Sequence, residues 1–179
     1  MKRLSGITLL ISLLTTAAAF GNSGNFSTGP VFSEFGAHAP VPEVSIAPTH
    51  MFKVAFDVAT SAKPGQANEG FDSLARFINM HVANGAKLDN IQLALVVHGT
   101  ATLDVIKHSA YKQKKGSENP SQALVSALLK HNVKVVVCGQ SSAANNVTPA
   151  MLIEGVEMDL SAMTAHARLS EQGFSVNPF

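Results

Sequence analysis

Val133-Lys134-Val135-Val136-Val137-Cys138 is the stretch that decides the fold, because every residue in it except the lysine is apolar. A strand of this composition lies inside a sheet whose two faces are both covered. The segment before it predicts a helix that starts at Asn119-Pro120, with asparagine as N-cap and proline at the first helical position. A helix that leads into a buried strand is typical of a parallel sheet.

The same alternation extends along the chain in both directions. Apolar β-rich runs predict further strands, and apolar residues at helical spacing predict further helices. The strands are expected at 51–58, 91–97, 155–160 and 174–176, and the helices at 71–82, 100–107 and 161–172. Residues 51–179 are therefore predicted to form one α/β domain in which a mostly parallel sheet lies between helices.

Residues 1–19 have the composition of an export signal. Lys2 and Arg3 supply the positive start, residues 7–14 form a short apolar core, and Ala17-Ala18-Ala19 suits a signal peptidase. We expect cleavage after Ala19 and a soluble mature protein in the periplasm or, as a second choice, outside the cell. The apolar run is too short to span a bilayer as a helix, so no membrane association is predicted.

Residues 20–50 have a different character. They hold half of the prolines together with glycine, serine and asparagine, and no helical or strand period persists in them. We expect an extended arm that wraps its own domain, wraps a neighbouring subunit or stays loose.

Composition argues against several functional classes. The formal net charge is +1, so the chain carries no surplus charge for nucleic acid or for a membrane surface. No two histidines have the spacing of a helical zinc pair, and no glycine pattern matches a nucleotide-phosphate loop. No metal ion and no cofactor is predicted. The basic cluster is expected to surround a solvated loop; it consists of Lys107, Lys112, Lys114 and Lys115.

Cys138 is the only cysteine, and it ends the valine-rich strand. In an oxidising compartment such a thiol is buried and inert, paired between chains, or kept for its reactivity. The following residues, 139–142, predict a glycine turn and then a capped helix start. Backbone N–H groups at a helix N-terminus favour the thiolate, so the pKa of this thiol is expected to lie below that of a free cysteine. A small residue that merely closes a core strand fits the same position.

Other polar side chains are expected at the carboxyl ends of strands, where open α/β sheets bind ligands. They are Asp57, His98 and Asp159. His98 is interpreted as a proton carrier or anion partner, or else as a hydrogen-bonded structural group. If the first strand lay between the second and third, His98 would start roughly 10 Å from Cys138, since neighbouring strands are about 4.8 Å apart. Asp57 and Asp159 are interpreted either as a carboxylate pair or as caps and turn residues.

Several short motifs follow one another along the chain in a characteristic order. They are Phe52-Lys53-Val54-Ala55-Phe56-Asp57, residues 68–81, Leu95-Val96-Val97-His98-Gly99, Asn119-Pro120, Val137-Cys138-Gly139-Gln140-Ser141, residues 160–164, residues 172–174 and Pro178-Phe179. In order and spacing they resemble the DsrE/DsrF-like family, in particular its exported members with a signal peptide. The resemblance covers the chain from about residue 50 to the C-terminus.

This resemblance implies a three-layer, flavodoxin-like sheet of about five strands and a homo-oligomer, either a trimer or a hexamer. For the sulfur-relay members it implies a cysteine that carries persulfide sulfur between donor and acceptor proteins, and Cys138 occupies the matching position. The supporting residues lie in the matching motifs: Asp57, Asn68, His98, Gly99, Gly139, Gln140 and Ser141.

We therefore expect a periplasmic protein that carries sulfane sulfur on Cys138. Backbone N–H groups at Gln140 and Ser141 would stabilise the persulfide anion, and His98 would move a proton. Two alternatives are a non-catalytic small-ligand-binding or assembly module of the same fold, and a thiol redox sensor.

Overall fold

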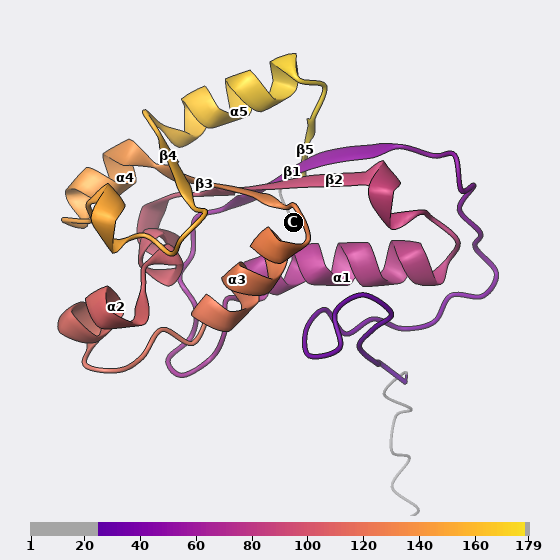
Figure 1. Ribbon diagram of the computed structural model, residues 1–179, viewed down its shortest axis with the longest axis horizontal. Helices are drawn as coiled ribbons and strands as arrows, with labels where there is room; N and C mark the ends of the chain where they lie inside the picture. The colour runs from indigo at the N-terminus through magenta and orange to yellow at the C-terminus, as the bar shows by residue number, and fades with distance from the viewer. Residues whose placement is uncertain (1–24, 178–179) are drawn as a thin grey trace, which may run out of the picture.

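The computed structural model describes residues 25–177, and it confirms the α/β fold (Figure 1). One sheet has the strand order β4-β3-β2-β1-β5, and each neighbouring pair runs parallel. The strands are β1 (Phe52–Val58), β2 (Ile91–Val97), β3 (Lys134–Cys138), β4 (Glu157–Asp159) and β5 (Ser175–Asn177). The valine-rich strand β3 lies between β2 and β4, which explains why it is apolar on both faces.

The helices complete an alternating β/α order. They are α1 (Glu69–Ala83), α2 (His108–Lys115), α3 (Gln122–Lys130), α4 (Gly139–Ala144) and α5 (Ala162–Glu171), with 3-10 turns η1 (Leu88–Asn90), η2 (Gly99–Val105) and η3 (Pro149–Met151). Within residues 25–177 no helix combines the length and the apolar character needed to cross a bilayer. The predicted signal peptide and its cleavage site lie outside the described residues.

Helices cover the two faces of the sheet unequally (Figure 1). α1 and α3 pack on one face and bury large side chains such as Phe71 and Leu124 there. In the described part of the chain the opposite face is covered by α5, which buries only Ala165 and Leu169 against small residues such as Ala94. Three layers result, and the layer formed by α5 is the thinner one.

Two segments differ from the sequence-based expectation. Residues 108–115 were expected to be loop but form helix α2, whose last turn holds three lysines near the negative end of the helix dipole. Gly116 ends this helix in the left-handed conformation, with φ 79°. The helix expected over 100–107 is instead a 3-10 helix, η2.

The start of α3 also differs, because Asn119 does not cap it. The Asn119 side chain donates to the backbone oxygens of Asp104 and Ile106, and its Oδ1 accepts from the Ser121 N–H. These bonds hold residues 119–121 in a turn, so the helix begins only at Gln122.

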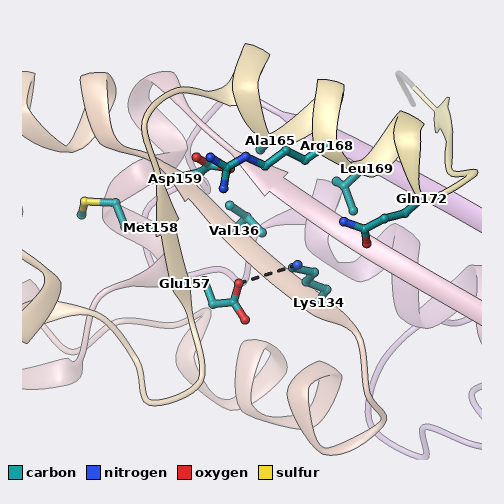
Figure 2. A pocket seen from close by; sticks show the side chains of 9 residues that line it. All are labelled: Lys134, Val136, Glu157, Met158, Asp159, Ala165, Arg168, Leu169 and Gln172. Atoms are coloured by element: carbon teal, nitrogen blue, oxygen red, sulfur yellow. Dashed lines mark ion pairs between the residues drawn. The ribbon is translucent and has the colours of Figure 1, made fainter.

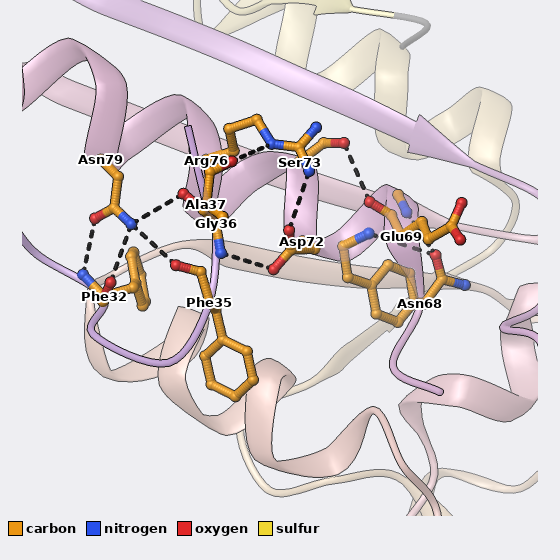
Figure 3. Close-up of polar contacts among 12 residues, drawn as sticks. Phe32, Phe35, Gly36, Ala37, Asn68, Glu69, Asp72, Ser73, Arg76 and Asn79 are labelled. Carbon is orange, nitrogen blue, oxygen red and sulfur yellow. Dashed lines mark hydrogen bonds and ion pairs between the residues drawn. The ribbon is translucent and has the colours of Figure 1, made fainter. Parts of the chain in front are cut away.

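The arm lies against its own domain (Figure 3). The buried side chain of Asn79 in α1 accepts from the Val31 and Phe32 N–H groups and donates to the Phe32, Phe35 and Gly36 carbonyls. Phe32 is buried in the core, and its ring contacts that of His131 edge-on at 4.6 Å.

Two further bonds fix the arm beside α1. Gly36 N–H donates to Asp72 Oδ1 over 2.7 Å, and Arg76 Nε donates to the Ala37 carbonyl over 2.8 Å. One helix therefore holds the arm through side chains on three successive turns.

Candidate functional site

Cys138 is both the last residue of β3 and the N-cap of α4. Its backbone is extended, and its Sγ accepts a hydrogen bond from the Ser141 N–H at 3.4 Å. The expected separate glycine turn is absent, because Gly139 is already the first residue of the helix. The sulfur thus takes the place that a serine or aspartate oxygen usually holds at a helix start.

Groups at two helix starts lower the pKa of this thiol. Burial raises the pKa of the Cys138 thiol, but the Ser141 hydroxyl and the N–H groups of Ser141, Ala162 and Gln140 lower it by more. Gln140 and Ser141 lie in the first turn of α4, and Ala162 is the first residue of α5. The pKa of this thiol therefore lies below its ordinary value, which favours the thiolate.

The thiol is buried, and two exposed apolar side chains stand at the start of α5. Cys138 is only 6% exposed, whereas Leu160 and Met163, on either side of the α5 start, are 68% and 80% exposed. The Gln140 side chain donates to the Leu160 carbonyl over 3.3 Å and links the two helix starts.

Gly139 permits the close approach of these two helix starts. A Cβ on Gly139 would lie 2.8 Å from the Asp159 carbonyl oxygen and 3.2 Å from that of Leu160. Any larger residue would therefore separate α4 from the loop that leads into α5.

Gly99 makes a second close contact at the end of β2. Its φ is +56°, and a Cβ there would lie 2.8 Å from the Ala59 carbonyl oxygen. Its N–H donates to Ser141 Oγ over 2.9 Å. The loop after β2 is thereby joined to the helix that starts at the thiol.

Asp57 bridges two histidines at the carboxyl ends of the strands. Its Oδ2 lies 3.0 Å from His98 Nε2, and its Oδ1 lies 2.7 Å from Nε2 of His166 in α5. Burial raises the pKa of Asp57, but the hydrogen bonds and charges of His98 and His166 lower it by more. A carboxylate pair with Asp159 is wrong, because β1 and β4 are separated by β2 and β3.

The position of His98 relative to Cys138 also differs from the conditional expectation. Strand β2 lies between β1 and β3, and Val97 pairs with Val137. The residues that follow each of them, His98 and Cys138, therefore leave neighbouring strands, about 4.8 Å apart. His98 directs its Nε2 to Asp57, on the side of β2 away from β3.

Asn68 belongs to a different polar cluster. It is buried and caps α1, where its Oδ1 accepts from the Gly70 and Phe71 N–H groups. Its Nδ2 donates to Asp104 Oδ2 over 2.7 Å. These bonds fix the start of α1 and do not involve Cys138.

A groove follows β3 beneath α5 (Figure 2). Every second residue of a strand faces the same side of the sheet, and on this side of β3 these residues are Lys134, Val136 and Cys138. The groove is lined by Lys134 and Val136 and has a volume of about 190 Å³. Lys134 pairs across its floor with Glu157 at 3.7 Å. Both charge signs line it, so the groove has no bias toward anionic or cationic ligands.

No group of three or more His, Cys, Asp and Glu side chains in residues 25–177 is arranged to hold a metal ion. His166 is the site residue that sequence reasoning missed. No local motif marks it, since it lies 109 residues from Asp57 and only the path of α5 across the sheet brings the two together.

One family model and two solved structures are similar to this chain. Residues 53–178 match the sequence model of the DsrE/DsrF-like family. The crystal structure of the ychN protein from E. coli has a TM-score of 0.52 and 21% identity, covering 72% of this chain and 100% of that chain. A protein of unknown function from Methanobacterium thermoautotrophicum, MTH1491, has a TM-score of 0.49 and 18% identity, covering 72% and 99%. No curated protein shows a significant match.

Proposed function

The chain belongs to the DsrE/DsrF-like family, and from this premise we propose that it carries sulfane sulfur as a persulfide on Cys138. The observation that supports the proposal is the hydrogen bond from the Ser141 N–H to Sγ at the start of α4. The Ser141 hydroxyl and the N–H groups of Gln140 and Ala162 also lower the thiol pKa. These groups favour a sulfur anion, and an anion is what both the nucleophile and the loaded carrier require.

The proposed reaction is an exchange between sulfur atoms. The Cys138 thiolate attacks the terminal sulfur of a donor persulfide, R–S–SH; a new S–S bond forms, the donor's S–S bond breaks, and R–S⁻ leaves. In the second step an acceptor thiolate attacks the outer sulfur of the Cys138 persulfide and regenerates the Cys138 thiolate. The number of electrons and the total charge are unchanged in both steps, so no external oxidant or reductant is needed.

The test is sulfur uptake by the purified full-length protein. After polysulfide treatment, intact mass spectrometry is expected to show one added sulfur atom, mapped to Cys138 and removed by dithiothreitol. Cys138→Ser should abolish the gain, while Ser117→Ala, in an exposed loop, should retain it. Equal uptake by Cys138→Ser would refute the proposal.

The near-complete burial of Cys138 favours a second candidate, a non-catalytic binding or assembly module in which the thiol only closes the site. The two functions predict different chemistry at the sulfur. A carrier thiolate reacts with iodoacetamide at mildly acidic pH, whereas an inert thiol reacts slowly across the whole pH range. Slow reaction together with an ordinary thiol pKa would select the binding module.

We also propose export to the periplasm, assembly into a trimer or hexamer, and exchange with donor and acceptor proteins. The charged, apolar and small residues of 1–19 support the first proposal, and the exposed side chains of Leu160 and Met163 support contact with another protein surface. Cell fractionation with the N-terminal mass tests export, and light scattering tests assembly. A full-length cytoplasmic monomer would contradict both.

A further inference from the structure

The start of helix α5 lies beside the helix that begins at the thiol, because the Gln140 side chain donates to the Leu160 carbonyl, and the Ala162 N–H contributes to lowering the thiol pKa. Apolar packing, however, fixes α5 only weakly. Its two buried residues, Ala165 and Leu169, pack on the sheet against Ala55, Ala94, Val96 and Val136, none of which is larger than valine. Small, smooth side chains leave the position of a helix along its axis poorly determined, because few side chains interlock. Polar bonds of fixed length are then needed to hold the helix in register.

The bond between Asp57 and His166 is such a contact. His166 lies four residues after Ala162, so the two residues occupy the same face of α5, one turn apart. The His166 Nε2 lies 2.7 Å from Asp57 Oδ1, and a carboxylate oxygen can only accept, so Nε2 donates. This bond ties the first turns of α5 to the end of β1.

The other oxygen of Asp57 acts on the opposite side of the site. It holds His98, and the next residue, Gly99, donates its N–H to Ser141 Oγ. One carboxylate thus contacts both α5, whose first N–H lowers the pKa of Cys138, and the residue before Gly99, whose N–H bonds the Ser141 hydroxyl oxygen.

We propose that Asp57 and His166 are positioning residues, which hold the start of α5 against Cys138 without touching the sulfur. The inference rests on the proposed function only in taking Cys138 as the reacting group. Loss of His166 should let the start of α5 move away, so that the sulfur loses the Ala162 N–H and the thiolate becomes less favoured.

Glutamine is the matched replacement for His166. Its side-chain amide nitrogen reaches about as far as Nε2 and still donates to Asp57. The His166 Nδ1, which is buried without a hydrogen-bond partner, makes no bond for the replacement to reproduce. His166→Gln should therefore preserve the brace, and His166→Ala should remove it.

The experiment measures the pH dependence of iodoacetamide alkylation of Cys138 in the full-length protein. For His166→Ala we expect the rate at about pH 6 to fall roughly three- to tenfold, with less than about twofold change at about pH 10, where the thiol is ionised in every variant. His166→Gln should restore the wild-type profile, and Ser170→Ala, exposed on the same helix, should retain it.

Leu169→Ala distinguishes the loss of the Asp57–His166 bond from a general weakening of the packing of α5. This substitution weakens the packing of α5 but leaves the bond between Asp57 and His166 in place. It should therefore lower the thermal midpoint. The ratio of the alkylation rate at about pH 6 to that at about pH 10 should stay within about twofold of wild type. An equal loss of the ratio in Leu169→Ala, or an unchanged profile in His166→Ala, would overturn the inference. Because alkylation needs no sulfur donor, this result is independent of whether Cys138 takes up sulfur.

Discussion

The Ser141 hydroxyl oxygen accepts the Gly99 N–H over 2.9 Å and so joins α4 to the end of β2. A hydroxyl accepts through its lone pairs and keeps its own hydrogen for another bond. The same hydroxyl lowers the pKa of Cys138. The Gly99–Ser141 contact therefore fixes the position of a group that lowers the thiol pKa, and it also joins two segments of the chain.

Ser141→Ala is expected to raise the thiol pKa, because the sulfur loses its side-chain donor while the backbone donors remain. Alkylation by iodoacetamide at about pH 6 should slow roughly three- to tenfold, with little change at high pH. Ser117→Ala, in the exposed loop after α2, serves as the control. A pH profile identical to wild type would show that the hydroxyl does not act on the sulfur.

Gly139→Ala is expected to destabilise the protein by about 1–3 kcal/mol, because its Cβ would meet backbone rather than a movable side chain. Urea unfolding followed by circular dichroism measures this loss. Ala143→Ser, at an exposed position of the same helix, should change stability by less than about 0.5 kcal/mol. Equal stabilities of the two variants would show that the loop leading into α5 moves away from the added Cβ with no loss of stability.

Asp104→Asn is expected to change how stability depends on pH. Burial raises the pKa of Asp104 more than its bonds to Asn68 and Ala62 and the charge of Lys115 lower it. The folded protein therefore keeps this proton to a higher pH than the unfolded chain, and this group's contribution to stability falls as pH rises from the unfolded pKa through the folded one.

The asparagine variant cannot ionise and lacks this loss. Its urea midpoint relative to wild type should therefore increase between about pH 4 and about pH 7. A relative midpoint that stays constant or decreases over this interval would contradict the assignment. Comparison of the two pH values cancels any constant cost of the substitution itself.

Asn79→Ala is expected to release the arm. Several backbone groups of residues 31–36 lose their partner inside the protein, at a cost of about 2–4 kcal/mol. Limited proteolysis should then cut within the arm. Asn90→Ala removes one exposed bond to the Pro48 carbonyl and should leave the arm resistant; equal resistance of both variants would show that Asn79 does not hold it.

The elements whose signal is local were predictable from the sequence. Strands β2 and β3 are almost entirely buried and β1 is partly buried, and the apolar runs of all three predict them directly. Helix α2 was missed, because its eight residues are mostly polar and only Ala110 is buried. Its position depends on a capping glycine and on packing, which a periodicity argument underweights.

The features of the candidate site also divide into those with a local sequence signal and those without one. The position of Cys138 at a strand end and a helix start follows from adjacent residues, and the structure agrees with it. Its chemical role remains a prediction. The strand order, the donor from Ala162 and the contact of Asp57 with His166 all depend on how distant segments pack, and no spacing in the sequence encodes them.

The attachment of the arm to α1 has a consequence for any attempt to isolate the α/β sheet. A chain cut at residue 51 would lose Phe32 from the core and leave the Asn79 amide facing an emptied surface. Within the arm itself, the bridge between Ser27 and His38 and several further bonds, such as Gly29 N–H to the Phe32 carbonyl, join only residues close in sequence, so a free peptide of this sequence would not keep its shape. Because the bonds that fix residues 31–37 come from side chains of α1, we expect the arm and this helix to lose their structure together.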